Sequence, residues 1–516
     1  MALRTCKNLD AISEYASDPL VLASILLAKD RRFLGTTTVS STSITKMIAD
    51  TTRTATEDSL FHFKFVFGDK VLRVFTVKDV VVSVLKENWE GQIIGSGSGA
   101  LHDLIEAANK YTAVNVFVEE IPLTDIDPQL VNYVKACVEN VEGVYITLWR
   151  KRGLYGFIIE ELINDRGSYT YVFKARDGAG NVYALKVLKE DIAVNRNFMD
   201  LVRGYIHGFT VRTLDKEEVS DLIAIKGYDN AILKELTIYS NYISSIYALL
   251  IMKNKLDKDT YSLYSPAIVE EYADMGDLED FVKKRGSLNL NESMYILIRV
   301  VGATALAHLA NIVHMDIKPK NILLRQTSDK YGYVPMLTDF SGALGDPAHG
   351  YKFARLTPAY ADPLALVRGT SDFSYDAYSL AMTLAYMLSS SIPKHRLILN
   401  IALLQNVYGY PIPMEKIEDG ETMLKDFAKK VLDLALRLRG KAISYREFVN
   451  AVADDVEALD NMYMPWLSDI PKTLAEVIKK ALTLKEEDRY RSCVEMWLDL
   501  RNSLIKENME ELIPKA

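Results

Sequence analysis

A short charged segment between two apolar ones constrains the fold more than any other part of the chain. Residues 314–324 read HMDIKPKNILL, with five polar or charged side chains in the first eight positions and three apolar residues directly after them. Apolar stretches flank the segment on both sides, so the fold must bury its surroundings while keeping these charges satisfied. The cluster is either a solvated turn or a site where charge performs chemistry.

Length and composition limit the classes of protein to which the chain can belong. Its 516 residues predict two or three domains, and a content of 49% hydrophobic and 25% charged residues is typical of globular chains. The net charge of −8 argues against a dedicated nucleic-acid binder, so we expect no nucleic acid as a partner.

Cysteine usage and hydropathy indicate the compartment. Cys6, Cys137 and Cys493 lie far apart, their number is odd, and no CxxC pair occurs. This pattern argues against a disulfide framework and a structural zinc site, and it favours a reducing interior. The sequence shows no signal-peptide pattern at its start and no apolar run of membrane-spanning length, so we expect a soluble cytoplasmic protein without membrane insertion.

The first 150 residues are expected to form a small α+β or α/β accessory domain. Four phenylalanines alternate with other residues over 61–67, which predicts a β-hairpin over 61–77 with one aromatic face. Apolar periodicity and turn residues predict the remaining elements: helices over 8–30, 101–111 and 127–141, and strands over 113–121 and 144–150. The Ser/Thr-rich stretch 35–59 is expected to be a connector, with or without a short helix inside it.

A glycine-rich stretch, GSGSG at 95–99, precedes one of these predicted helices. Glycines at the start of a helix can cradle a phosphate, but this stretch lacks the lysine of a P-loop and the GxGxxG spacing. We interpret it as a flexible turn.

A second region begins near residue 155 and changes character along its length. Residues 156–191 predict three successive strands, with the turn DGAG between the second and the third. Helical patterns dominate from there to the end, including a buried helix over 378–388 and helices within 394–465. A strand-rich part followed by a helix-rich part indicates two lobes of one domain.

The charged segment resembles the catalytic loop of eukaryotic-type protein kinases. That family has the pattern H-R-D-x-K-x-x-N, and residues 314–321 match its order and every gap, with Met315 in place of the arginine. The resemblance covers about two thirds of the chain and implies an α+β, bilobal protein kinase-like fold after the accessory domain. The expected boundaries are 1–150 for the accessory domain, 155–510 for the kinase domain, about 155–272 for its small β-rich N-lobe and about 273–510 for its larger helical C-lobe.

Transfer of a γ-phosphoryl group explains why these residue types occur together, because the reaction depends on positioning and on neutralised charge. Asp316 suits the base that accepts the proton of the incoming hydroxyl, and Lys318 suits a cation beside the moving phosphate. Asn321 and Asp339 supply oxygen ligands for magnesium. Asp339 lies in LTDFSG, which resembles the D-F-G motif with Ser341 in place of glycine. The implied cofactors are ATP and Mg²⁺, with Mn²⁺ as an alternative metal.

The resemblance assigns further residues to nucleotide binding. Lys186, in VYALKVLK, matches the lysine that contacts the α- and β-phosphates. Its expected partner is Glu235, the acidic residue of an apolar segment over 230–250 that reads as a helix. Gly167 matches the central glycine of the phosphate loop. Five more residues are expected around the adenine base: Val172, Ala184, Glu271, Ala273 and Leu323.

The segment RLTPAYADP, residues 355–363, resembles the substrate-facing loop of the same family. Thr357 matches the threonine typical of Ser/Thr kinases, where it contacts the catalytic aspartate and lysine. Together with Lys318, it implies phosphorylation of serine and threonine side chains on protein substrates, including autophosphorylation. Asp376 matches the residue that braces the backbone of the catalytic loop.

Several positions depart from the family pattern. Only one of three glycines survives in the phosphate loop, and Glu270 falls where the pocket usually has an apolar residue. The final A-P-E reads Asp362-Pro363-Leu364, so Arg489 lacks its glutamate partner and could use Asp362 instead. These departures motivate an alternative function, a pseudokinase scaffold or regulatory nucleotide-binding module. A small-molecule kinase of related fold is a third interpretation.

Two features of the sequence bear on how the expected kinase activity is regulated. Met315 cannot bind a phosphate as the family's arginine does, so we expect activity without phosphorylation of the activation segment. Residues 1–150 and 394–465 are the expected binding regions for a regulatory partner.

Overall fold

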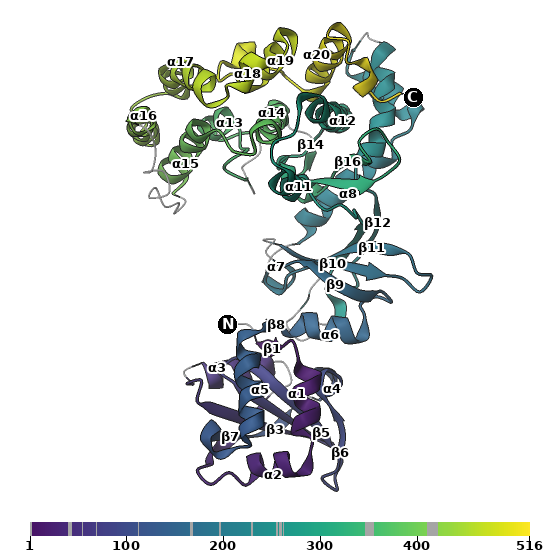
Figure 1. Cartoon of the computed structure of the whole chain (residues 1–516), viewed down its shortest axis with the longest axis vertical. Helices are drawn as coiled ribbons and strands as arrows, with labels where there is room; N and C mark the ends of the chain where they lie inside the picture. The colour runs from purple at the N-terminus through teal and green to yellow at the C-terminus, as the bar shows by residue number, and fades with distance from the viewer. Residues whose placement is uncertain are drawn as a thin grey trace. The chain divides into compact units, whose positions relative to one another are not determined.

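The computed structural model divides into two compact units, which are described separately (Figure 1). The first unit comprises Met1–Asn197 and Ala248–Val269, and the second comprises Phe198–Tyr247 and Glu270–Ala516. The structure describes residues 3–39, 44–53, 55–68, 70–111, 113–165, 169–195, 198–228, 231–253, 256, 261, 263–345, 356–409 and 422–515. The first unit therefore holds the sequence of the expected accessory domain together with the strands expected for the N-lobe.

An eight-stranded sheet with helices organises the N-terminal part of the first unit (Figure 1). Its elements are, in chain order, β1 (Arg4–Cys6), α1 (Leu9–Ala16), α2 (Pro19–Leu26), β2 (Arg32–Val39), α3 (Ile44–Thr52), β3 (Ser59–Phe67), β4 (Lys70–Val77), β5 (Val80–Glu87), β6 (Ile93–Ser96), α4 (Gly97–Lys110), β7 (Val114–Pro122), η2 (Leu123–Asp125), α5 (Pro128–Glu139) and β8 (Val141–Gly143). The strand order is β2-β7-β3-β4-β5-β1-β8, with β6 paired to β5, and β1 and β5 are parallel. Apolar side chains of α1, α2 and α5 pack with the sheet in one core cluster.

The hairpin predicted over 61–77 is confirmed. β3 and β4 pair antiparallel along their length. Phe61, Phe63, Phe65 and Phe67 are at most 5% exposed, and the rings from Phe63 to Phe67 stack in succession. This aromatic face therefore belongs to the core of the domain.

The single helix predicted over 8–30 is two helices. The side chain of Asp18 caps α2 by accepting hydrogen bonds from the backbone N–H groups of Leu20 and Val21. Pro19 occupies the first position of α2, where a missing N–H leaves no hydrogen bond unmade. The apolar periodicity continues across this break, which is why it predicts one element.

The strand predicted over 144–150 is wrong, because these residues belong to helix α6 (Val144–Arg152). The first six residues of α6 are all buried, and the ring of Trp149 packs against Tyr171 and Phe173. β-branched and aromatic residues favour strands on a half-buried surface, but here they fill the surroundings of a helix buried on several sides.

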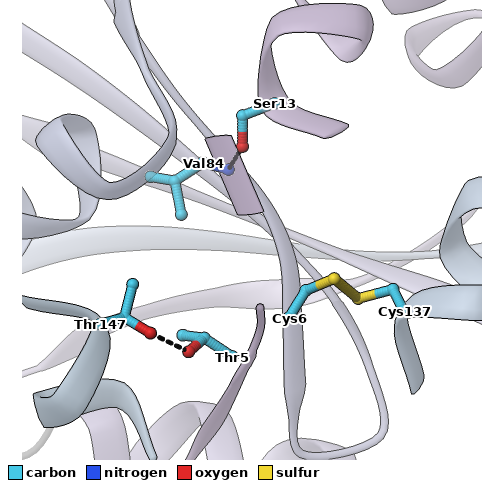
Figure 2. The surroundings of a disulfide bond; sticks show 6 residues. All are labelled: Thr5, Cys6, Ser13, Val84, Cys137 and Thr147. Atoms are coloured by element: carbon cyan, nitrogen blue, oxygen red, sulfur yellow. Dashed lines mark hydrogen bonds between the residues drawn. A yellow bond between two sulfur atoms is a disulfide. The ribbon is translucent and has the colours of Figure 1, made fainter. Parts of the chain in front are cut away.

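The expectation that the cysteines form no disulfide is also wrong. Figure 2 shows the disulfide between Cys6 of β1 and Cys137 of α5, both at most 3% exposed. The two residues are 131 positions apart, and such a separation gives no spacing motif that the sequence could reveal. Beside the disulfide, a 2.6 Å hydrogen bond joins Thr5 of β1 to Thr147 of α6 (Figure 2). Cys493 is a buried free thiol.

The GSGSG stretch leads into α4, whose start binds a carboxylate of the same chain. Asp10 of α1 accepts hydrogen bonds from the N–H and the hydroxyl of Ser98, at 2.7 Å each. A Cβ atom on Gly97 would lie 2.2 Å from Asp10 Oδ1, so this approach requires glycine. The interpretation as a flexible turn is wrong, because Gly95 and Ser96 end strand β6, and α4 begins directly after it at Gly97.

A five-stranded sheet completes the first unit. Its strands are β9 (Ile158–Asn164), β10 (Thr170–Arg176), β11 (Val182–Leu188), β12 (Ile246–Leu250) and β13 (Ala267–Glu271). Helix α7 (Glu190–Asn195) follows β11 along the chain. The order is β12-β13-β11-β10-β9, and β10 pairs antiparallel with both β9 and β11. This arrangement confirms the three strands predicted over 156–191.

Helices dominate the second unit. This confirms the predicted order along the chain, a strand-rich part followed by a helix-rich part. Its elements are α8 (Met199–Thr213), α9 (Lys216–Ile225), η3 (Ala231–Tyr242), α11 (Leu278–Arg285), α12 (Leu290–Leu309), β14 (Ile312–Val313), η4 (Pro319–Asn321), β15 (Ile322–Gln326), β16 (Tyr333–Leu337), η5 (Phe340–Gly342), β17 (Leu344–Gly345), α13 (Pro363–Arg368), α14 (Ser374–Ser389), α15 (Lys394–Tyr408), α16 (Thr422–Arg439), α17 (Tyr445–Tyr463), α18 (Trp466–Asp469), α19 (Lys472–Leu482), η8 (Glu486–Asp488), α20 (Cys493–Lys506) and η9 (Glu510–Leu512). By length and composition α12 could cross a membrane, but its apolar stretch is entirely buried in the unit's main core, so it is a core helix.

The helix predicted over 230–250 is wrong in type. The segment forms the 3₁₀ helix η3 and then strand β12. Leu233, Leu236 and Tyr239 of η3 are fully buried in the main core of the second unit, beside α12. Tertiary packing thus overrides the apolar periodicity that suggested an α-helix.

Candidate active site

The catalytic-loop residues are held by a buried carboxylate. Asp376 of α14 accepts hydrogen bonds from the backbone N–H groups of His314, at 2.7 Å, and Met315, at 3.0 Å. Met315 has a positive φ of 71°, and the ring of His314 hydrogen-bonds to the carbonyl of Thr338 at 3.0 Å. Asp376 is fully buried, so the bracing role that the sequence indicated is confirmed.

Two side chains of this loop meet one from the later segment 355–363, and we call the three the catalytic-loop cluster: Asp316, Lys318 and Thr357. The ammonium of Lys318 donates to Asp316 Oδ2 at 2.7 Å and to Thr357 Oγ1 at 2.8 Å. The hydroxyl of Thr357 donates to Asp316 Oδ1 at 2.9 Å. The side chains of Asp316 and Lys318 remain 16% and 18% exposed, so the cluster is both oriented and accessible.

A two-stranded ribbon brings the proposed metal ligands to one place. Ile322 of β15 pairs antiparallel with Leu337 of β16, so Asn321, just before β15, and Asp339, just after β16, lie at the same end. A 2.9 Å hydrogen bond from the N–H of Thr338 to the carbonyl of Asn321 fixes this end. The ribbon therefore places the two residues predicted to bind magnesium at one end, and their role toward the metal stays a prediction.

Each of these two residues is held in a defined orientation. The amide nitrogen of Asn321 donates to the carbonyl of Asp316 at 2.8 Å and to its Oδ2 at 3.2 Å, so the amide oxygen is the atom that a cation would meet. Asp339 has a left-handed backbone with φ 62° and ψ 57°, a conformation that costs about 1–2 kcal/mol and recurs at functional sites. The hydroxyl of Tyr205 donates to Asp339 Oδ1 at 3.4 Å.

The donor set fits a magnesium ion that also binds phosphate. One carboxylate and one amide oxygen are hard ligands, and Mg²⁺ usually completes its shell with water and substrate phosphates instead of an all-protein cage. Consistent with this, no group of three or more His, Cys, Asp or Glu side chains that could hold a metal occurs among the described residues. Asp339 and Asn321 could therefore hold Mg²⁺ only together with a nucleotide.

In the first unit, three of the residues expected around the nucleotide share one sheet face. Val172 of β10 lies opposite Lys186 of β11, and Lys174 lies opposite Ala184. Because side chains two apart in a strand share a face, Val172, Lys186 and Ala184 point to the same side. Lys186 is only 8% exposed, which distinguishes it from an ordinary surface lysine. Gly167 lies outside the described residues.

The expected adenine contacts of the second unit come from two places: Glu271 ends strand β13 and Ala273 follows it, whereas Leu323 lies on β15. The backbone N–H of Glu271 donates to the carbonyl of Ser245 at 2.9 Å, and its carboxylate forms an ion pair with Arg325. Ala273 accepts from the N–H of Gly276 at 3.3 Å. Leu323 of β15 is half-buried. Their roles toward adenine stay predictions.

Glu235 has a different partner from the one that we expected. Its carboxylate lies in η3 and forms an ion pair with Arg501 of α20, at 3.2 Å. The side chain of Glu235 is 41% exposed. The structure therefore places Glu235 on the helical part of the second unit, and its pairing with Lys186 of the first unit stays a prediction.

Two departures from the family pattern have a structural explanation. Arg489 donates to Asp362 Oδ1 at 2.9 Å, and both side chains are buried, which confirms that Asp362 replaces the missing glutamate. Glu270 is 1% exposed, and its Oε2 accepts a 3.0 Å hydrogen bond from the hydroxyl of Thr338. This carboxylate of β13 is thus hydrogen-bonded to the residue just before Asp339.

Helix α8 lies against the segment after Asp339, and this contact was not predicted from the sequence. A Cβ atom on Gly204 would lie 2.2 Å from the carbonyl oxygen of Phe340, and one on Gly208 would lie 2.9 Å from its ring. Tyr205, on the same helix, is 2% exposed. Two glycines four residues apart in an otherwise helical pattern are the signal that could have revealed this close approach.

Comparison with known protein families identifies one that matches the part of the chain containing this site. The protein kinase domain family matches residues 208–497, more than half of the chain. The matched range contains the catalytic loop, Asp339 and Thr357, whereas Lys186 lies before its start.

Similar proteins include three kinases. The serine/threonine-protein kinase ArnS of Sulfolobus acidocaldarius is 27% identical over 326 residues, which is 59% of this chain and 48% of that protein. PknA of Nostoc, also a serine/threonine-protein kinase, is 28% identical over 38% of this chain and 36% of its own length. PknK of Mycobacterium bovis is 34% identical over 24% and 11%, respectively. The chain therefore spans half or less of these relatives' lengths, and it belongs to the protein kinase domain family.

Proposed function

We propose that this chain transfers the γ-phosphoryl group of ATP to serine and threonine hydroxyls of protein substrates, including its own. The observation that carries the proposal is the catalytic-loop cluster, where Lys318 and Thr357 hold both carboxylate oxygens of Asp316 beside the ribbon end with Asn321 and Asp339. The three relatives described above are serine/threonine-protein kinases by name, which supports the choice of acceptor.

In this proposal each residue has one task. Asp316 orients the acceptor hydroxyl and takes its proton as the oxygen bonds to phosphorus. Lys318 keeps positive charge beside the reacting oxygens, and Thr357 fixes the carboxylate. Bound Mg²⁺–ATP would supply the transferable group and neutralise its charge. Asn321 and Asp339 would hold the metal.

The contribution of the first unit is proposed from the resemblance and from its sheet. Lys186 would bind the α- and β-phosphates, and Val172 and Ala184 would cover the base from the same sheet face. The low exposure of Lys186, on the sheet face that also carries Val172 and Ala184, distinguishes it from a surface lysine and supports this role.

The test compares the wild type with Asp316→Asn, using γ-labelled ATP, Mg²⁺ and a general protein acceptor. Asp316→Asn keeps the shape of the side chain but removes the base, so labelling should fall by about 10²–10⁴-fold. Asp433→Asn is the matched control, because Asp433 is exposed on α16, and it should leave labelling unchanged. Acid hydrolysis of the labelled acceptor should give phosphoserine and phosphothreonine.

Two outcomes would contradict the proposal. Equal labelling by the wild type and Asp316→Asn would remove Asp316 from the reaction. Absence of labelling by the wild type on several acceptors, despite binding of Mg²⁺–ATP, would favour the pseudokinase scaffold.

A further inference from the structure

We propose that Tyr205 is a positioning residue for the metal-binding carboxylate of Asp339, and that the glycine face of α8 exists to bring it there. The inference deepens the proposed function and rests on it. It assigns to α8 a task at the metal site that neither the catalytic-loop motif nor the D-F-G-like motif contains.

The first observation is the hydrogen bond itself. The hydroxyl of Tyr205 donates to Asp339 Oδ1 at 3.4 Å, across 134 positions of sequence. A hydroxyl is a neutral donor, so it can orient a carboxylate without cancelling the charge that a cation needs. A lysine or arginine at the same place would compete with the metal for this carboxylate.

The second observation is how α8 approaches the segment. Gly204 and Gly208 are four residues apart, so they lie on one helix face. A Cβ atom on Gly204 would lie 2.2 Å from the carbonyl oxygen of Phe340 and 2.9 Å from the backbone of Ser341, so a larger residue would push the helix away. Phe340 is 2% exposed beneath this face.

The third observation concerns the rigidity of both partners. Tyr205 is 2% exposed and therefore held by packing, which limits the positions that its hydroxyl can take. Asp339 has a left-handed backbone, a conformation that its surroundings must enforce. A rigid donor on a closely seated helix supplies that enforcement at the carboxylate.

The test measures binding of Mn²⁺ in the presence of a non-hydrolysable ATP analogue, by electron paramagnetic resonance on the full chain. Tyr205→Phe keeps the ring and removes the hydroxyl, so the Mn²⁺ dissociation constant should rise by about three- to tenfold. Tyr239→Phe makes the same change at another fully buried tyrosine, one that packs against Trp497, and it should leave the constant unchanged. The Mg²⁺ concentration for half-maximal phosphoryl transfer should shift with Tyr205→Phe, whereas the KM for the protein acceptor should not.

A second variant tests the approach of the helix. Gly204→Ala should weaken Mn²⁺ binding more than Tyr205→Phe, although alanine is the better helix former. Gly99→Ala in α4 is its control, because a Cβ atom there meets no atom within 4 Å. Equal Mn²⁺ affinity in wild type and Tyr205→Phe, with phosphoryl transfer intact, would overturn this inference and leave the proposed function standing. Absence of Mn²⁺–nucleotide binding by the wild type would overturn both.

Discussion

Two charged clusters of the second unit use similar groups in different surroundings. In the catalytic-loop cluster, the carboxylate and the ammonium are 16% and 18% exposed. In a second cluster, which we call the Asp460 cluster, His395 and Arg396 donate to Asp460 at 2.5–2.8 Å, and both are at most 2% exposed. Arg396 also donates to Tyr378 and to the carbonyl of Leu482.

The difference teaches that exposure of the basic partner distinguishes the two clusters, because the side chains of Asp316 and Asp460 are similarly exposed, at 16% and 13%. Burial raises the pKa of Asp460. The guanidinium of Arg396 and the hydrogen bond from His395 together lower this pKa by more, so the net pKa lies below the usual range. The Asp460 cluster joins α15 to α17 through a cation, Arg396, that is buried and so cannot reach a substrate. In the catalytic-loop cluster, two hydrogen bonds orient the ammonium of Lys318, and this side chain is 18% exposed.

The largest effect that separates the two clusters is expected from Asp460→Ala. The change leaves the Arg396 cation buried without its carboxylate, so the free energy of unfolding should fall by about 3–5 kcal/mol. Urea unfolding measures this loss. Phosphoryl transfer by the folded variant should stay within about twofold of wild type, because Asp460 does not touch the catalytic loop. A loss of stability below about 1 kcal/mol would mean that the cluster is not structural.

A smaller effect, on activity alone, is expected from Thr357→Val. The variant removes the hydroxyl that bonds to Asp316 and Lys318 but keeps the shape of the side chain. The rate of phosphoryl transfer should fall by about 10- to 100-fold, the effect of losing a hydrogen bond to a charged group. Thr383→Val, at a buried threonine of α14, is the control and should retain the wild-type rate. Equal rates in both variants would remove Thr357 from the site.

The pH dependence of stability should distinguish the Asp460 cluster next. Burial lowers the pKa of His395, and the hydrogen bond to Asp460 only partly offsets it. The unfolded chain therefore binds more protons than the folded one as pH falls through about 6.5, so the free energy of unfolding must decrease with falling pH. His395→Gln should show a shallower decrease between pH 7 and 5. The same slope in both proteins would refute this assignment.

The smallest effect is expected from the activation segment. Met315 is apolar and 3% exposed, so it has no means of binding a phosphate on that segment. Phosphatase treatment, or the double change Ser341→Ala and Tyr351→Phe, should alter phosphoryl transfer by less than about twofold. A large loss with an unchanged melting temperature would show that phosphorylation is required.

Much of the site could be predicted from the sequence because its chemistry is local. The spacing from His314 to Asn321 fixes which side chains meet within one loop, and the ribbon after it explains the position of Asp339. Strands β9, β10 and β11 could be predicted because successive residues of a strand point to opposite faces and differ in polarity, and because turn residues separate the strands.

What could not be predicted depends on contacts between distant segments. Helix α6 is buried on several sides, so its residues show no period that separates a helix from a strand. The pairing of Cys6 with Cys137 and the contact of Tyr205 with Asp339 join residues more than 130 positions apart. Glu235 was matched to the family's glutamate because it is the acidic residue of its segment, and in the structure it forms an ion pair with Arg501.

The central claim is that Asp339 and Asn321 bind a metal–nucleotide complex beside the base Asp316. Calorimetric titration with a non-hydrolysable ATP analogue, with and without Mg²⁺, tests it most directly. The account predicts saturable, Mg²⁺-dependent heat for wild type and for Asp316→Asn, and loss of the Mg²⁺ dependence in Asp339→Asn. Mg²⁺-dependent binding that is unchanged in Asp339→Asn, or no heat from the wild type, would contradict it.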